Sequence, residues 1–262
     1  MKIDIFSSSQ LRAFIVSSSH RYKEAFAYTL WAFSGLLITG LTTELSLSQI
    51  SKLSGVLIPT WFLITLAIYI LNDLSDRKFD KLVGNDQPIA TGEVKPKNAL
   101  PIVFVFSITA LLLSSLVNPF VLLISATYLG IGVIYSTPPL HIKKRLMGKQ
   151  FTLTSLFLLS LLAGGASVLR FPPTLLFLIM VFGIFTFFMT PIPDLKDMKS
   201  DSKQGCKSLP LLIGPKYCIY MGILAFSTLL FFAIWGFLYF NFNFFLIPMT
   251  ALLSLANICF VE

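Results

Sequence analysis

Charged residues are scarce in this chain. They make up 12% of the 262 residues, and only 12 residues are acidic. Hydrophobic residues account for 55% of the sequence, and the mean hydropathy is +0.81. Because these values lie far outside the usual range of soluble domains, the composition predicts an integral membrane protein.

Cysteine is scarce too, and a processed N-terminus is not expected. The three cysteines, Cys206, Cys218 and Cys259, are odd in number and lack the spacing of metal ligands, so neither a disulfide framework nor a zinc site is predicted. The serine-rich N-terminus is too polar for a cleaved signal peptide. Residues from about 10 to 23 have the pattern of an amphipathic helix lying on a membrane surface.

Long apolar runs are abundant. A helix crosses a bilayer with about 20 apolar residues, and eight runs are long enough: 24–42, 54–73, 98–116, 118–136, 151–170, 173–193, 216–240 and 243–262. The sequence therefore predicts an all-α, polytopic transmembrane bundle, a single domain over 1–262. We expect a central cavity, with the loops after the second and sixth runs as cytoplasmic caps.

The basic residues predict the orientation. Eighteen of the 20 Lys and Arg residues fall on one side of the predicted spans, leaving Lys52 and Arg170 for the other. By the positive-inside rule the richer side is cytoplasmic, and it includes the N-terminus. The net charge of +8 thus reflects topology, and no nucleic-acid partner is expected.

Half of the 12 acidic residues form two clusters with one spacing, D-x-x-D-x-x-x-D: Asp73, Asp76 and Asp80, then Asp194, Asp197 and Asp201. Carboxylates at this spacing share one helix face, and both clusters follow apolar runs on the predicted cytoplasmic side. Each aspartate recurs 121 positions later, as does Gly84 at Gly205, which suggests two similar halves. Such crowding of like charge is usually tolerated when cations are held between the carboxylates.

Magnesium bound to a diphosphate suits these clusters. The ion prefers oxygen ligands and is usually bound by one or two carboxylates plus substrate phosphates. Lys78, Lys143, Lys144 and Lys203 are the nearest positive charges for the remaining phosphate oxygens. A prenyl chain attached to the diphosphate would suit an apolar cavity between helices, and aromatic faces could stabilise a carbocation formed there.

Four segments carry a family resemblance. The run from Asn72 to Asp80 resembles the N-D-x-x-D-x-x-x-D motif of the UbiA superfamily of intramembrane prenyltransferases. Asp194 to Pro210 resembles that family's second motif with its G-x-x-[ST]-L-P continuation. Residues 88–92 resemble the proline and glycine segment after the first motif, and residues 135–143 resemble the Y-S-x-P-P-x-x-x-K loop. Gln87 and His141 depart from the pattern at positions that are often basic.

The resemblance implies nine transmembrane helices, one more than the eight runs counted, and transfer of a prenyl group from a prenyl diphosphate to a lipophilic acceptor. The acceptor would be a quinone or aromatic precursor, or a glycerol-based lipid. The six aspartates would hold Mg²⁺ and the diphosphate, and four of them would be catalytic: Asp73, Asp76, Asp194 and Asp197. Substrate-binding roles are expected for Asn72, Lys78, Tyr135, Lys143 and Lys203.

Two other classes of function remain open. A terpene cyclase of the same superfamily would quench the carbocation within one molecule and need no acceptor. An ion-coupled transporter would also carry acidic residues within the membrane. A transporter predicts these acids near the bilayer midplane, whereas both clusters here follow the ends of apolar runs.

Overall fold

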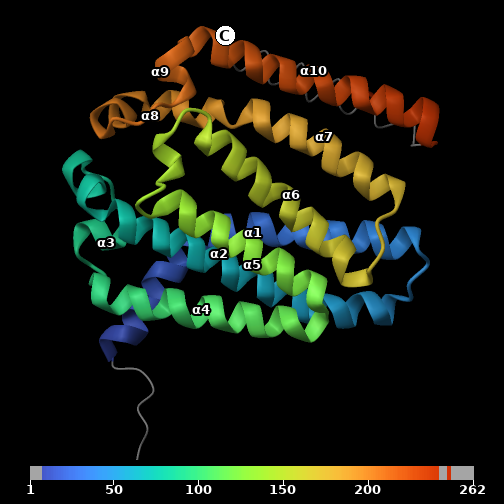
Figure 1. The fold of residues 1–262 in the computed structure, drawn as a ribbon, viewed down its shortest axis with the longest axis horizontal. Helices are drawn as coiled ribbons and strands as arrows, with labels where there is room; N and C mark the ends of the chain where they lie inside the picture. Colours follow the sequence, from blue (N-terminus) through green and yellow to red (C-terminus); the bar gives the residue numbers. More distant parts are fainter. Residues whose placement is uncertain (1–7, 242–246, 249–262) are drawn as a thin grey trace, which may run out of the picture. The chain divides into compact units, whose positions relative to one another are not determined.

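The computed structural model describes residues 8–241 and 247–248, which form helices and connections with no strands. Figure 1 shows these helices in chain order. They are α1 (Ser8–Thr42), α2 (Leu47–Val83), α3 (Pro88–Thr91), α4 (Pro96–Val117), α5 (Pro119–Ser136), the short 3-10 helix η1 (Ile142–Lys144), α6 (Gly148–Val168), α7 (Pro173–Met189), α8 (Pro191–Gln204), α9 (Leu209–Ile213) and α10 (Pro215–Phe240).

The chain divides into two compact units. The first contains α1 to α5 and the second half of α6, and the second contains η1, the first half of α6 and α7 to α10. The first motif lies on α2 and the second on α8, so each unit carries one of them.

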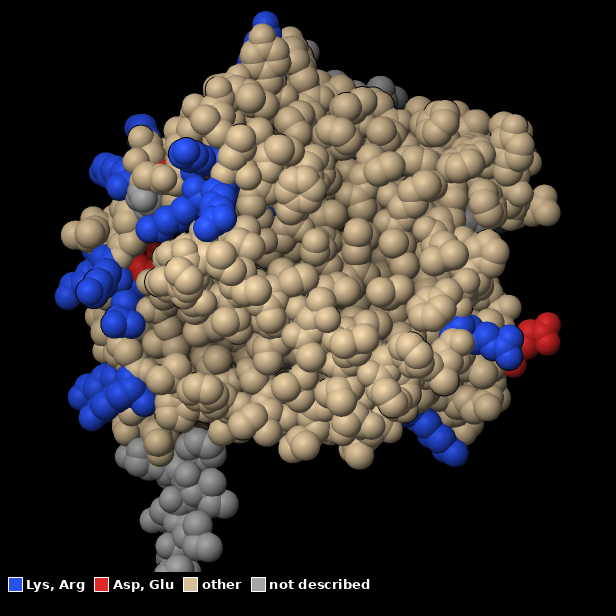
Figure 2. Space-filling model, viewed as in Figure 1, with Lys and Arg blue, Asp and Glu red and all other residues tan. Residues whose placement is uncertain are grey.

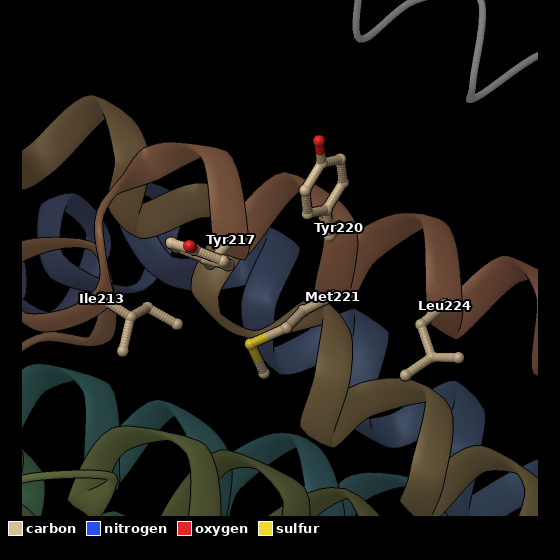
Figure 3. Close-up of a pocket in the computed structure, with 5 residues that line it drawn as sticks. All are labelled: Ile213, Tyr217, Tyr220, Met221 and Leu224. Atoms are coloured by element: carbon tan, nitrogen blue, oxygen red, sulfur yellow. The ribbon is translucent and has the colours of Figure 1, made fainter.

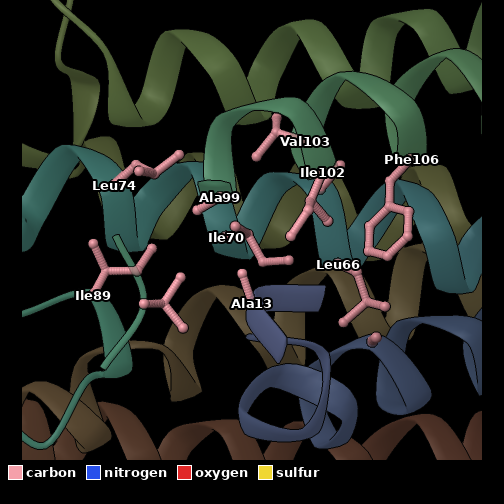
Figure 4. Close-up of a cluster of buried hydrophobic side chains, with 12 residues drawn as sticks. Ala13, Leu66, Ile70, Leu74, Ile89, Ala99, Ile102, Val103 and Phe106 are labelled. Carbon is pink, nitrogen blue, oxygen red and sulfur yellow. The ribbon is translucent and has the colours of Figure 1, made fainter. Parts of the chain in front are cut away.

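Helices α1, α2 and α4 share the core of the first unit. Figure 4 shows Leu66, Ile70 and Leu74 of α2 lying among side chains of α4 such as Ile102 and Phe106. Leu74 is 6% exposed and directly follows the first aspartate of the motif. Burial of this stripe therefore sets the rotation of α2 and the direction in which the motif points.

Local sequence determines where α2 begins and ends. Ser46 caps its first turn, because the Gln49 backbone N–H donates to the serine hydroxyl and the Gln49 side chain accepts from the Ser46 N–H, a capping box. The helix ends at Gly84, whose φ of 76° lies in the left-handed region that glycine adopts without strain. The first motif thus lies within the last turns of a continuous helix.

Helices α1 and α6 approach closely within the first unit. A Cβ atom added at Gly35 would meet the Leu161 backbone oxygen, and one added at Gly164 would meet the Leu36 backbone nitrogen. Two glycines at the crossing let the backbones touch, as small residues commonly do between membrane helices. Nearby, the Trp61 Nε1–H donates to the Ser160 hydroxyl at 2.8 Å.

The second unit is rich in aromatic contacts between α7 and α10. Phe177 packs against Phe232 with ring centroids 6.0 Å apart and against Trp235 at 5.7 Å. Prolines at 191 and 193 lack backbone donors, and α7 gives way to α8 at this point. The break separates an apolar helix from the polar helix that carries the second motif.

Seven segments among the described residues are long and apolar enough to cross a membrane, and they correspond to the first seven predicted spans. Over α4 and α5, Figure 2 shows a surface that is uncharged along most of both helices. The eighth predicted span, 243–262, lies almost wholly outside the described residues. The stretch 10–23 is helical as expected, but it is continuous with the first span in α1.

Candidate functional site

The first aspartate of the first motif is buried in an ion pair that joins two helices. Asp73 on α2 has a side chain 5% exposed, and Arg21 on α1 one 13% exposed. The Arg21 Nε–H donates to Asp73 Oδ2 at 2.9 Å, and Nη2 pairs with Oδ1. Both carboxylate oxygens therefore have a charged donor, a strong and geometrically specific arrangement.

Arg21 is held from other directions as well. Its Nη1 atom lies 2.9 Å from a carboxylate oxygen of Glu24, one turn along α1. Its guanidinium carbon lies 5.6 Å from the centre of the Tyr69 ring, within the range of a cation–π interaction. Two carboxylates and one ring thus fix this cation beside the motif.

Other polar residues of the first motif have local partners. The Ser136 hydroxyl at the end of α5 donates to Asn72 Oδ1 at 3.2 Å, and the Ser75 hydroxyl donates to the Ser136 carbonyl at 2.5 Å. Asp80 is buried and accepts from the Asn85 side chain at 2.8 Å. Asp76 is half-buried. Contacts between α2 and α5 therefore hold Asn72, and the turn after α2 holds Asp80.

Lys78 lies on a different side of α2. With Arg77 and Lys97 it lines a surface groove of about 520 Å³, whose described lining includes none of the three aspartates. The remaining lining is Leu71, Leu74, Ser75, Pro96, Leu100, Thr137, Pro138 and His141. Lys78 is thus adjacent to the motif in sequence but faces a separate basic and apolar groove.

The second motif repeats the pairing at its first aspartate. Asp194 lies in the first turn of α8 with a side chain that is 0% exposed, and its Oδ1 pairs with Nζ of Lys149 at the start of α6. Its Oδ2 is buried without a hydrogen-bond partner among the residues that the structure describes. A buried carboxylate oxygen left in this way costs free energy until a donor or a cation reaches it.

The other residues of the second motif are more accessible. Asp197 and Asp201 are half-buried and Lys203 is exposed. Burial raises the pKa of Asp201 above its ordinary value of 3.8, while a contact with Ser208 and the charge of Lys149 lower it. Gly205, with φ 69°, ends α8, matching the role of Gly84 in α2.

The loop residues proposed from sequence fall in different units. Tyr135 is half-buried in the last turn of α5, in the first unit. Lys143 is half-buried in η1, in the second unit. The Lys207 backbone N–H donates to the Lys144 carbonyl at 3.3 Å, so η1 lies beside the loop that follows the second motif.

The donors present suit Mg²⁺ that is only partly ligated by protein. Within the described part of the chain, no three His, Cys, Asp or Glu side chains come together as a complete metal site. Magnesium characteristically combines one or two carboxylates with waters and substrate phosphates. The unpartnered Oδ2 of Asp194 is a suitable single ligand, so the residues fit this ion.

Arg21 and Lys149 were missed as site residues by the sequence reading, which counted both only as markers of orientation. Each is the partner of the first aspartate in its motif. The sequence did indicate that such partners must exist, because an acid buried beside an apolar helix requires a cation. It could not say which of the 20 basic residues would serve, because both partners come from other helices.

A further hollow in the second unit has different chemistry. It is lined by Ile213, Tyr217, Tyr220, Met221 and Leu224 and has a volume of about 600 Å³. In Figure 3, Met221 and Leu224 extend to one side of α10 while the ring of Tyr220 extends to the other. Its described lining has no charged side chain, so the hollow suits an apolar molecule and not a diphosphate.

The seven spans and the two buried acid–cation pairs define a multi-span, all-helical integral membrane protein with two related carboxylate motifs. The model of the UbiA prenyltransferase family matches residues 25–261. The chain therefore belongs to the UbiA prenyltransferase family.

Curated relatives are enzymes of two kinds. The chain is 28% identical over 153 residues to a 4-hydroxybenzoate octaprenyltransferase of Hydrogenovibrio crunogenus, which covers 56% of this chain and 51% of the relative. It is 25% identical over 187 residues to a digeranylgeranylglyceryl phosphate synthase of Methanothrix thermoacetophila, covering 71% and 66%. The matches thus span between half and two thirds of these relatives.

Solved structures share the fold. A digeranylgeranylglyceryl phosphate synthase structure matches with a TM-score of 0.71 at 18% identity, covering 96% of this chain and 86% of that one. A UbiA homologue from Archaeoglobus fulgidus bound to GPP and Mg²⁺ matches with a TM-score of 0.70 at 18% identity, covering 97% and 86%. These likenesses establish the UbiA fold for this chain.

Proposed function

We propose that this protein is a Mg²⁺-dependent membrane prenyltransferase that moves a polyprenyl group from a prenyl diphosphate to a lipophilic acceptor. The observation that carries the proposal is the repeated motif, in which a buried first aspartate is paired with a cation from another helix. The motif occurs twice in a chain of the UbiA prenyltransferase family. A protein that only needed solubility at a helix end would not bury these carboxylates.

Different residues of this chain are proposed to bind different parts of the prenyl diphosphate donor. We assign metal and diphosphate binding to the two motifs, Asp73, Asp76, Asp80, Asp194, Asp197 and Asp201. Asn72, Tyr135, Lys143 and Lys203 are proposed to contact the diphosphate or shape its surroundings. Lys78 is proposed to bind substrate from the separate groove that it lines. When bound, the metal ion supplies positive charge that stabilises the leaving diphosphate.

The donor and acceptor classes follow from the relatives. A structural neighbour is bound to GPP, a prenyl diphosphate, and curated relatives are named for 4-hydroxybenzoate and for a glyceryl phosphate. We propose the same donor class here, and an acceptor that is either an aromatic quinone precursor or a glycerol-based lipid. In both cases the acceptor would present an oxygen or carbon nucleophile to an allylic cation and release a proton as the new bond forms.

The orientation is part of the proposal. Eighteen of the 20 basic residues fall on one side of the spans predicted from the sequence, so we infer that the N-terminus and both motifs are cytoplasmic. Mg²⁺ from the cytoplasm and a lipophilic acceptor from the bilayer would then meet at the cytoplasmic surface of the membrane.

The deciding experiment is a product assay with purified protein in detergent or lipid. Geranyl, farnesyl, geranylgeranyl and longer diphosphates are each incubated with 4-hydroxybenzoate or with a glycerol-phosphate lipid, with Mg²⁺ and with a chelator. We expect a prenylated acceptor only when Mg²⁺ is present. A cyclic hydrocarbon or alcohol formed without acceptor would establish a cyclase instead, and no consumption of any diphosphate would refute the proposal.

A further inference from the structure

The pair formed by Lys149 and Asp194 is only half complete. Lys149 holds Oδ1, whereas Oδ2 is buried and has no partner in the described part of the chain. The carboxylate is 0% exposed, yet the lysine side chain is 31% exposed. The acid is thus fixed in the interior while its cation lies at the edge of the site.

The corresponding pair in the first unit differs in each of these respects. Arg21 occupies both oxygens of Asp73, lies against Glu24 and Tyr69, and is 13% exposed. Arginine forms a planar two-point fork with a carboxylate, whereas lysine is a compact charge on a flexible stem. We therefore expect the ion pair of Arg21 with Asp73 to stay formed, and the ion pair of Lys149 with Asp194 to separate more readily.

The charges around Lys149 favour a cation of higher charge. Asp194 interacts electrostatically with Asp201 and Asp197 as well as with Lys149, and Lys149 also acts on Asp201. Asp194 is therefore acted on by two neighbouring carboxylates and by one ammonium group. A divalent cation would neutralise more of this charge than the ammonium group does.

We propose that Lys149 is an exchangeable partner of Asp194. In the metal-free protein the ammonium group holds the carboxylate; in the loaded protein a divalent cation occupies Asp194, and Lys149 binds an oxygen of the diphosphate. The same lysine thus keeps the empty site from carrying uncompensated charge and then becomes a substrate-binding residue. The inference rests on the proposed function, since it assigns a further residue to the donor site.

The exchange predicts opposite effects of one substitution. Lys149→Met removes the competitor for Asp194, so Mn²⁺ titrated without any diphosphate should bind about 10-fold more tightly. The same variant loses a phosphate partner, so inorganic pyrophosphate with Mg²⁺ should bind about 10-fold more weakly. Isothermal titration calorimetry on the full-length protein measures both. Lys216→Met, an exposed lysine at the start of α10, should leave both affinities unchanged.

A structural role for Lys149 predicts something else. If the lysine only braces α8 against α6, Lys149→Met should weaken Mn²⁺ binding or leave it unchanged, and either result overturns the exchange. If Lys149→Met fails to fold, Lys149→Arg is measured in its place. Arginine should hold Asp194 more firmly than lysine does and so weaken Mn²⁺ binding. Unchanged or tighter Mn²⁺ binding in Lys149→Arg overturns the proposal. The Mn²⁺ titration contains no prenyl donor, so it tests the exchange even if the product assay rejects a transferase.

Discussion

Arg21 and Asp73 form a two-point ion pair although they lie 52 positions apart in the sequence. The pair joins α1 to α2 at the first aspartate of the first motif. Because both groups are largely buried, the Asp73 carboxylate depends on Arg21 for compensation of its charge. The segment before the first predicted span is thereby part of the candidate site.

Removing one member of this pair should destabilise the protein. Arg21→Met leaves the Asp73 carboxylate buried without its cation, and we expect a loss of about 3 to 5 kcal/mol in the free energy of unfolding. Thermal or denaturant unfolding in a fixed detergent measures the change. The double variant Arg21→Met with Asp73→Leu removes both charges and should recover much of the loss. Equal losses in the single and double variants would argue against a mutually dependent pair.

Aspartates that are only half-buried should matter for turnover more than for folding. Asp76→Asn and Asp197→Asn keep the side-chain shape but remove the negative charge, and each should reduce prenyl transfer by about 100-fold or more. Unfolding temperature should change little. Asp86→Asn alters an exposed acid outside the motifs and serves as the control. Wild-type turnover in both motif variants would show that the motifs are not part of the catalytic site.

The crossing of α1 with α6 should tolerate no added atom. Gly164→Ala places a methyl group against the backbone of Leu36 and Gly35, so the helices must separate and the yield of folded protein should fall sharply. Gly130→Ala is the matched change within α5, since a Cβ there meets nothing within 4 Å. The control should be neutral or stabilising by up to about 1 kcal/mol, because alanine favours a helix over glycine. Size-exclusion profiles and unfolding temperatures compare the two, and similar behaviour would contradict the close crossing.

The proposed orientation can be tested in sealed membrane vesicles. In a background with the native cysteines replaced, Lys97→Cys should react with an impermeant thiol reagent only from the cytoplasmic side. Lys52→Cys should react only from the opposite side, because the two positions flank predicted spans at opposite ends. Both residues are exposed, so neither substitution should disturb packing. Labelling of both from the same side would overturn the orientation.

Sequence reasoning was most successful for properties carried by local composition. The seven described spans were predicted because a bilayer requires about 20 apolar residues in each helix, and their order follows directly. The ends were less accurate: α1 and α2 extend well beyond their predicted apolar cores, to Ser8 and Val83. Polar residues there continue the helix, since helix formation depends on backbone hydrogen bonds and caps and not only on hydrophobicity.

The two aspartate motifs could also be predicted from the sequence, but the side chains around them could not. The spacing of Asp73, Asp76 and Asp80 is a local property, and so is its repeat 121 positions later. Their unequal burial is not local: Asp73 is buried against Arg21 of α1, while Asp76 stays half-exposed. Lys78, close in sequence, faces a different groove because the helix rotates by about 100° per residue.

The amino-acid sequence alone was sufficient to predict a helical membrane protein, its spans, its two aspartate motifs and its resemblance to a prenyltransferase family. These features depend on composition and short-range spacing. The tertiary structure decided which cations serve the motifs, that Arg21 grips both oxygens of Asp73, and that Lys149 leaves one oxygen of Asp194 unpartnered. Such pairings join distant segments, and only the packing of whole helices brings one particular lysine or arginine to a buried acid.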